Sequence, residues 1–256
     1  MKKNHLYCVG TGKSGTHSIA GIFKNYKVAH DPDEHQAIKI ITRIHKGQLT
    51  LSEARMHIKE REDYLDLEVN SSVLNYFFLG ELLSLFPDAK FILTIRDCYT
   101  WLDSVLNHQL SHPCPEWLKD FYEIRYRPNR YEHSKEDSIL ADCGLYSIEG
   151  YLACWAEHNA FVIQTVAKDR LLIVRTTDIS VSLGRISDFV GVPLQTLDKQ
   201  KTHLYPARTK YYLLDKIDSD FLAEKADFHC SKLMAEFFPD IISYDCISKH
   251  SKRAEG

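Results

Sequence analysis

The order of apolar and polar positions along the chain predicts strands and helices that alternate. Short apolar runs predict strands, at 5–10, 27–30, 64–68 and 91–96. Amphipathic or largely apolar stretches predict helices, at 16–26, 51–63, 73–86 and 218–238, and the sequence DPDE predicts a turn or a helix start at 31–34. This alternation is typical of an α/β fold, with a mostly parallel central sheet in three layers and helices on both faces.

One segment departs from this rhythm. Residues 111–143 combine aromatic, basic and acidic side chains with three prolines, and no linker rich in proline, glycine or serine divides the chain. We therefore expect a single domain over 1–256, in which 111–143 is an insertion or a lid over a substrate. A solvent-exposed irregular connection would have the same composition. The aromatic side chains of 111–143 suit a flat ring or sugar as substrate; they are Trp117, Phe121, Tyr122, Tyr126 and Tyr131. The acidic side chains of this segment would tolerate a cationic substrate; they are Glu116, Asp120, Glu123 and Glu132.

The stretch HLYCVGTGKSGTHSIA at 5–20 carries the strongest chemical signal. An apolar strand leads into a glycine-rich turn with Lys13 and the hydroxyls of Ser14, Thr16 and Ser18, and a helix follows. Such a turn directs backbone amides, the positive end of a helix dipole and an ammonium toward one point. This arrangement predicts a binding site for a phosphate or sulfate ester, since an ordinary turn would need the glycines but neither the lysine nor the hydroxyls.

Three kinds of phosphate-binding loop have a spacing close to that of this segment. A Walker A loop fails because Tyr7 stands where that motif requires a glycine. The glycines match a dinucleotide-binding turn, with Asp31 or Asp33 as its acidic residue, but a lysine inside the turn has no part in that site. The third is the 5′-phosphosulfate loop of sulfotransferases, K/R-x-G-T/S-x-S/T, and the run from Lys13 to Ser18 resembles it without a gap.

A second group of residues favours the third loop. The segment 91–108 begins as a buried apolar strand, ends that strand at Arg96, and continues into a helix that carries Ser104. Arginine offers a bidentate fork for a phosphate group. The separation of Arg96 and Ser104 resembles the site that holds the 3′-phosphate in sulfotransferases, although an arginine at a strand end is by itself more often part of a surface ion pair.

The chain therefore resembles sulfotransferases that use 3′-phosphoadenosine 5′-phosphosulfate (PAPS), of the soluble bacterial type with a P-loop-like fold. Three further segments resemble parts of that family: 150–166 its long helix with a tryptophan, 171–180 its late strand with an acidic turn, and 185–193 the short helix that follows. The resemblance covers most of 5–193. The family's loop for the adenine and the 3′-phosphate is expected between Lys199 and Lys210. Cys98 stands where many members have a proline, and His17 stands where cytosolic members have an aromatic residue.

The resemblance implies the residues that contact the donor. They are Gly12, Lys13, Ser14, Gly15, Thr16, His17, Ser18, Arg96 and Ser104. By analogy with phosphoryl transfer, charge builds on the bridging oxygen of the leaving phosphate, and Lys13 is expected to neutralise it. No metal is expected. The spacing of His108, His112 and Cys114 could serve zinc, but nearby prolines and the lack of a fourth ligand argue against such a site.

A general base for the acceptor hydroxyl has three candidates. Glu34 is the first, because it follows the second predicted strand at the carboxyl edge of the sheet, and 31–34 resembles the segment with the catalytic glutamate in bacterial carbohydrate and tyrosylprotein sulfotransferases. Glu68 is the second, because 67–72 loosely resembles a segment of heparan-type sulfotransferases and lies at the end of the strand predicted over 64–68. His17, inside the loop, is the third; a solvated surface acid is the plain alternative for either glutamate.

Composition agrees with a soluble cytoplasmic enzyme. A net charge of −3 and a pI near 6.5 argue against a nucleic-acid binder. No apolar run has the length of a membrane span, and a first strand beginning near His5 leaves no room for a signal peptide or anchor. Seven cysteines without a C-x-x-C pair indicate reduced thiols.

Other functions remain open at this stage. An atypical P-loop kinase would need magnesium ligands, for which Asp97 and Asp178 are the available strand-end aspartates. An NAD(P)-binding reductase would need no site at Arg96 and Ser104, and a binding scaffold would need no base. An anionic polymer as acceptor would need a basic groove, which the net negative charge of the chain disfavours. For a sulfotransferase, the expected acceptor is therefore a hydroxyl or amine of a small metabolite or natural product, with a carbohydrate as the next choice. The oligomeric state is not predicted.

Overall fold

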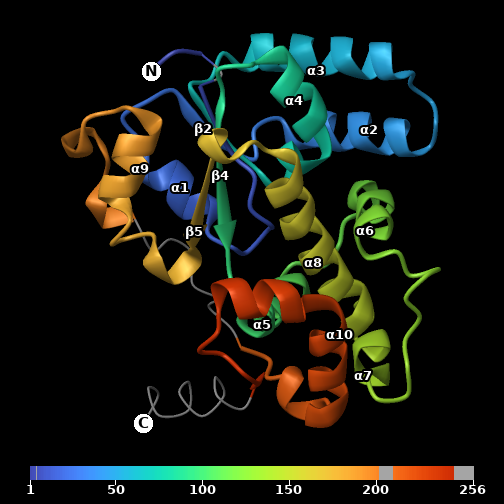
Figure 1. Ribbon diagram of the computed structural model, residues 1–256. Coiled ribbons are helices and arrows are strands. Elements are labelled where there is room, and N and C mark those ends of the chain that lie inside the picture. The colour runs from blue at the N-terminus through green and yellow to red at the C-terminus, as the bar shows by residue number, and fades with distance from the viewer. Residues whose placement is uncertain (4, 202–209, 245–256) are drawn as a thin grey trace. The chain divides into compact units, whose positions relative to one another are not determined.

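The computed structural model describes residues 1–3, 5–201 and 210–244 (Figure 1). These residues divide into two compact units, which we call the sheet unit (1–95 and 158–201) and the helical unit (96–157 and 210–244). The single domain expected over 1–256 stays a prediction.

The sheet unit contains five described strands, all parallel, in the order β2-β3-β1-β4-β5. Their bounds are β1 Leu6–Cys8, β2 Val28–His30, β3 Val69–Ser71, β4 Lys90–Ile95 and β5 Leu171–Arg175. The central strand β1 aligns Leu6 with Val69 of β3 and with Lys90 of β4. The parallel α/β sheet that the sequence predicts is thus confirmed.

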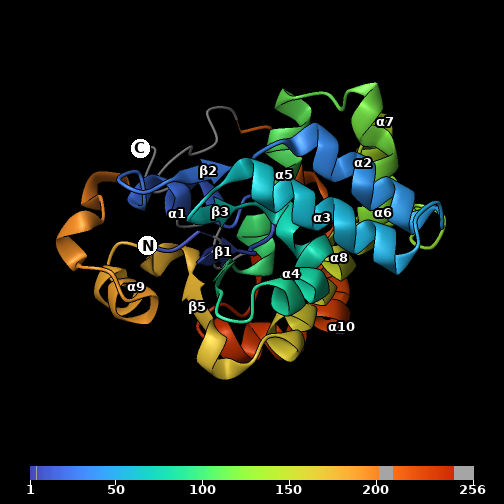
Figure 2. The same cartoon turned by 90° about the horizontal axis from the view of Figure 1, so that it is seen from above.

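Helices cover both faces of this sheet, because alternate residues of the strands are buried on opposite sides. Helices α1 (Thr16–Ile22) and α9 (Leu183–Val190) share a core with Leu6 and Cys8 of β1. On the other face, Tyr7 stacks on Phe86 beside α4 (Leu79–Leu85) and donates a hydrogen bond to α3 (Leu51–Leu65). Figure 2 shows these two pairs of helices on opposite sides of the strands.

The strand predicted over 64–68 is wrong. Helix α3 continues through Leu65 and ends at Asp66, whose φ of 50° is left-handed, and β3 begins only at Val69. The pattern concealed β3 because two of its three buried residues, Asn70 and Ser71, are polar. The predicted helix over 73–86 begins with a 3-10 segment, Val73–Phe78, and the start expected at 31–34 opens α2 (Glu34–His45).

The helical unit consists of α5 (Cys98–Ser111), α6 (Lys119–Tyr126), α7 (Ser138–Asp142), the first part of α8 (Ile148–Thr165) and α10 (Ser219–Phe237). Its core includes Trp101 of α5 and Trp155 of α8, both fully buried. Residues 111–143 contain α6 and α7, and Phe121 and Tyr126 are buried there, so these two rings are core rather than a surface for a substrate. The insertion or lid stays a prediction.

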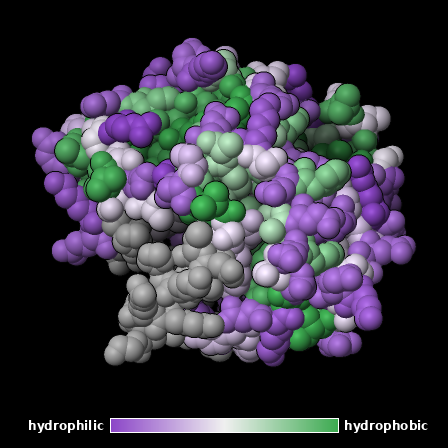
Figure 3. Space-filling view, turned by 60° about the horizontal axis from the view of Figure 1, so that its bottom comes forward, coloured by the Kyte–Doolittle hydropathy of each residue, from purple (hydrophilic) through white to green (hydrophobic). Residues whose placement is uncertain are grey.

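The described surface is of mixed polarity. Figure 3 shows one face, on which hydrophilic side chains surround small hydrophobic patches. In the described part of the chain, none of the helices combines the length and the apolar character needed to cross a bilayer.

Candidate functional site

The loop between β1 and α1 is shaped by two glycines. A Cβ atom on Gly10 would lie 2.1 Å from Thr94 Oγ1 and 2.8 Å from the Thr94 carbonyl oxygen, so the loop can pass β4 this closely only without a side chain. Gly15, at the start of α1, has a φ of 105°, and a Cβ atom there would meet Ile179 at 2.8 Å. Both positions therefore require glycine for the backbone to follow this path.

Ser14 holds the loop in place from within. Its amide and its hydroxyl both donate to the carbonyl oxygen of Thr11, at 3.1 and 2.6 Å, and its hydroxyl lies 3.0 Å from that of Thr94. Thr176 donates a further hydrogen bond to the Ser14 carbonyl. The structure therefore turns Ser14 inward, whereas Lys13 stands beside it, partly exposed, in a left-handed conformation with a φ of 68°.

His30, the last residue of β2, connects the loop to an aspartate. Its Nε2 lies 3.0 Å from the hydroxyl of Thr16, and its Nδ1 lies 3.1 Å from Oδ2 of Asp31. Burial and the nearby ammonium of Lys13 lower the pKa of His30 to about 4, so the imidazole is neutral at pH 7. The contact with Asp31 is then a hydrogen bond from Nδ1–H rather than an ion pair, and Nε2 accepts from Thr16.

His17 lies on the exposed side of the same cluster. Its ring stacks on that of His30, with centroids 3.4 Å apart and planes inclined by 17°. Desolvation, His30 and Lys13 together lower the pKa of His17 to about 4, against the opposite effect of Asp31. At neutral pH His17 is therefore an uncharged imidazole next to the loop, as a proton acceptor must be.

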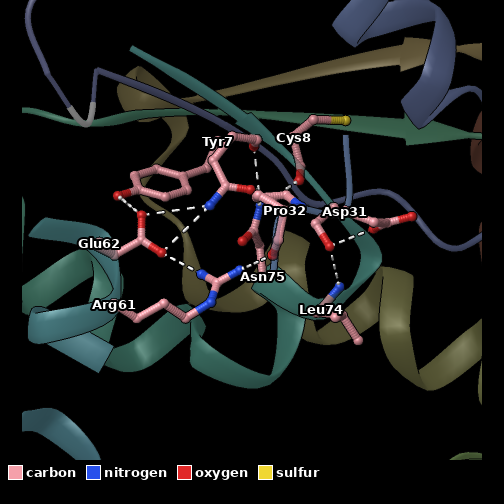
Figure 4. A network of polar contacts seen from close by, with 10 residues as sticks. Tyr7, Cys8, Asp31, Pro32, Arg61, Glu62, Leu74 and Asn75 are labelled. Carbon is pink, nitrogen blue, oxygen red and sulfur yellow. Dashed lines mark hydrogen bonds and ion pairs between the residues drawn. The ribbon is translucent and has the colours of Figure 1, made fainter. Parts of the chain in front are cut away.

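A strained turn carries the acidic residues that follow β2. Asp31 and Asp33, on either side of Pro32, have φ values of 46° and 48°, in the left-handed region that residues other than glycine seldom adopt. Two side chains hold this turn. Ser72 donates to Oδ1 of Asp31 at 2.5 Å, and Arg61 donates to the Pro32 carbonyl, as Figure 4 shows for the arginine.

Glu34 begins α2 directly after this turn. Its side chain is exposed, yet desolvation by the surrounding protein and the charge of Asp31 raise the pKa of its carboxyl. The structure thus places Glu34 in the segment that follows the carboxyl end of β2, where the sequence predicts it.

Glu68 does not lie at this edge of the sheet. It precedes β3, where its carbonyl accepts from the amide of Leu6, so it stands at the amino ends of the strands, whereas the loop follows their carboxyl ends. Burial acts to raise its pKa, but hydrogen bonds from the Met1 ammonium and the Lys27 amide prevail and lower it. The expectation that Glu68 ends a strand is wrong, because that strand begins at Val69.

In the helical unit, the side chain of Arg96 contacts the first turn of α5. Its Nε donates to Thr100 Oγ1 at 2.9 Å, and Thr100 in turn donates to Asp97, the N-cap of the helix. Burial lowers the pKa of this guanidinium, against the opposite effect of the nearby carboxylates of Asp97 and Asp103. Ser104, 7% exposed, lies one turn beyond Thr100 on the same face of the helix.

Two other predicted regions have different outcomes. Of the loop expected between Lys199 and Lys210, residues 202–209 lie outside the described residues, and Lys199 begins a 3-10 segment. The rings of His108 and His112 lie 4.6 Å apart on neighbouring turns. Within the described ranges, no three His, Cys, Asp or Glu side chains gather as metal ligands would.

Comparison with known proteins decides the family. The family model described as "Sulfotransferase domain" matches residues 5–198. The chain belongs to this sulfotransferase domain family. The matched residues include the loop, the acidic turn, Arg96 and β5. Membership in the family supports an enzyme with sulfotransfer activity.

Solved structures of other sulfotransferases match this chain, and the first of them shares its fold. The sulfotransferase STF9 from Mycobacterium avium is 12% identical, with a TM-score of 0.52, over 93% of this chain and 78% of its own. A sulfotransferase from Alicyclobacillus acidocaldarius is 13% identical, with a TM-score of 0.46, over 95% and 94%. Mouse SULT7A1, solved in complex with PAP, is 12% identical, with a TM-score of 0.38, over 87% and 67%. No curated protein sequence matches the chain.

Sequence reasoning about this sulfotransferase missed His30, Asp31 as its partner, and the buried pair Arg61–Glu62. His30 carried a usable signal, because it ends the first strand predicted after the loop. The pair on α3 carried none, since charged residues in a charged helix are ordinarily solvated.

Proposed function

We propose that the protein transfers a sulfuryl group from PAPS to a hydroxyl or amine of a small metabolite, a natural product or a carbohydrate. The observation that carries this proposal is the loop from Gly10 to Ser18. It combines the phosphosulfate motif with a backbone shaped by Gly10 and Gly15, in a chain of the sulfotransferase family.

The loop fits the 5′-phosphosulfate end of the donor. A side chain on Gly12 would meet no heavy atom within 4 Å, so a ligand would have room on that side of the residue. The amides at the start of a helix lack partners within the helix and favour an anion. Lys13 would neutralise the charge that develops on the bridging oxygen, and Ser14 would act through the shape of the loop, since its own polar groups face inward.

The 3′-phosphate would be held by Arg96 and Ser104. The hydrogen bond from Nε to Thr100 fixes the plane of the guanidinium and leaves its two terminal nitrogens for two phosphate oxygens. Asp97 supports this geometry through Thr100 and through its cap of α5.

The transfer itself needs a proton acceptor. As the acceptor oxygen or nitrogen bonds to sulfur and the bond from sulfur to the bridging oxygen breaks, the proton of the acceptor passes to a base. We assign this role to Glu34, whose raised pKa makes it a stronger base than an ordinary carboxylate. His17, neutral and exposed beside the loop, is the second candidate.

Calorimetric titration tests the donor directly. The protein is titrated with 3′-phosphoadenosine 5′-phosphate (PAP), and in parallel with ADP, ATP with Mg²⁺, and NADPH. We expect tight binding of PAP, weaker binding of ADP and none of NADPH. Tight binding of ATP or NADPH without PAP would contradict the proposal and would leave the loop as an anion site for another nucleotide.

A further inference from the structure

Helix α3 buries two neighbouring charged residues beside the sheet. Arg61 is 4% exposed and Glu62 is 1% exposed. Glu62 accepts from the Tyr7 hydroxyl at 3.0 Å, from Asn70 at 3.4 Å, and from Nη1 of Arg61 at 2.5 Å. This set of contacts, drawn in Figure 4, fixes the carboxylate against β1 and β3.

The second branch of the Arg61 guanidinium reaches the acidic turn. Its Nη2 donates to the Pro32 carbonyl, between the two left-handed residues Asp31 and Asp33. The rigid fork of arginine makes both contacts possible at once, one branch on Glu62 and the other on the turn. Arg61 thereby connects the strained turn to the interior of the sheet unit.

Stability alone does not account for this pair. Burying two charges costs desolvation energy, and a well-packed apolar pair is often at least as stabilising as a buried ion pair. An apolar side chain at 61 could fill the same volume, but it could not bind the carbonyl of Pro32. The contact that arginine adds is therefore one that holds the turn, beside the bond from Ser72 to the Asp31 carboxylate and the bond from the Asp31 amide to the Ser71 carbonyl.

We infer that Arg61 is a positioning residue, which holds the acidic turn so that the Asp31 carboxylate faces His30. With Asp31 in place, His30 carries its proton on Nδ1 and accepts from Thr16 through Nε2. When the turn relaxes, Asp31 withdraws, and the proton of His30 returns to Nε2, which then donates to Thr16. The relevance to catalysis rests on the proposed function, because Thr16 belongs to the proposed donor loop.

The tautomer of His30 reports the position of the turn without an activity assay. We would measure it at pH 7.5 from the ¹⁵N shifts of the imidazole nitrogens in the labelled full-length protein. The wild type should show the Nδ1–H form. Arg61→Lys retains a charge for Glu62 but lacks the fork, and it should move at least half of the population to Nε2–H. Arg55→Lys, an exposed position on the same helix, is the matched control and should change nothing.

A double variant guards against misfolding of the first. Arg61→Met with Glu62→Gln removes both charges together, leaves no buried charge unpaired, and should give the same change of tautomer. If either variant is folded by circular dichroism and keeps the Nδ1–H form, Arg61 is only structural and the inference is overturned. Titration of the wild type with PAP tests the proposed function separately, since the tautomer can be as inferred whether or not PAP binds.

Discussion

Acid should destabilise the sheet unit through His30. The neutral imidazole is 17% exposed and is held by Thr16 and Asp31, and its pKa in the folded protein is lowered to about 4. In the unfolded chain a histidine titrates near 6.5. Below that pH the unfolded chain gains a proton that the folded protein does not take up, so the stability is complete above pH 6.5 and is lost as the pH falls toward 4.

The size of the effect follows from the two pKa values. A shift from 6.5 to about 4 corresponds to at most ~3.4 kcal/mol of folding free energy, at 1.36 kcal/mol per pH unit. Linkage between pH 7 and pH 5 alone gives a loss of ~2 kcal/mol. His17 has a similar pKa but is exposed, and solvent screening reduces its share.

Urea unfolding at pH 7 and pH 5 measures this loss. We compare the wild type with His30→Asn, whose amide can still donate to Asp31 but does not titrate, and with His45→Asn at an exposed position as a control. The wild type and the control should lose ~2 kcal/mol more than His30→Asn over this interval. An equal loss in all three proteins would refute the assignment of His30 as a buried neutral group.

Three further predictions concern the loop, the arginine and the base. In a urea titration, Gly10→Ala should lower the free energy of unfolding by about 1–3 kcal/mol, because the methyl group of the alanine would lie 2.1 Å from a threonine hydroxyl. Gly12→Ala is the control: its methyl group would have no neighbour within 4 Å, so it should change the free energy of unfolding by less than about 0.5 kcal/mol. Arg96→Ala should reduce the preference for PAP over ADP by about 10- to 150-fold in calorimetry, the worth of one charge-assisted contact, and an unchanged preference would remove the 3′-phosphate site. In a PAPS-consumption assay with an acceptor found by screening hydroxyl and amine compounds, Glu34→Gln should lower kcat by about 10²-fold or more, whereas Glu68→Gln should keep kcat; the reverse result would restore Glu68 as the base.

The loop and the parallel sheet could be predicted because their signals are contiguous in the chain. Residues 5–20 contain a strand, a turn and a helix start in fixed spacing, and Lys13 stands within that turn. The position of Arg96 was predictable for the same reason, since a buried strand ends directly before it. The parallel direction of the strands follows from the helices between them.

The rest depends on contacts between distant segments. Arg61 and Glu62 lie in a helix predicted as charged, and they are buried because Tyr7, Asn70 and the Pro32 carbonyl come to them from three other segments. No local pattern contains that information. Glu68 was misplaced because the strand beside it is short and polar.

The bond from Thr176 to Ser14 has a consequence for the order of folding. It joins residues 162 positions apart, and Gly15 rests on Ile179 from the same late segment. At a synthesis rate of about 5–20 residues per second, the loop emerges from the ribosome about 10–30 s before the residues that brace it. A nascent chain shorter than about 180 residues therefore has the loop sequence without the braced loop. Because such long-range contacts form late, the braced loop should form in the last stage of folding.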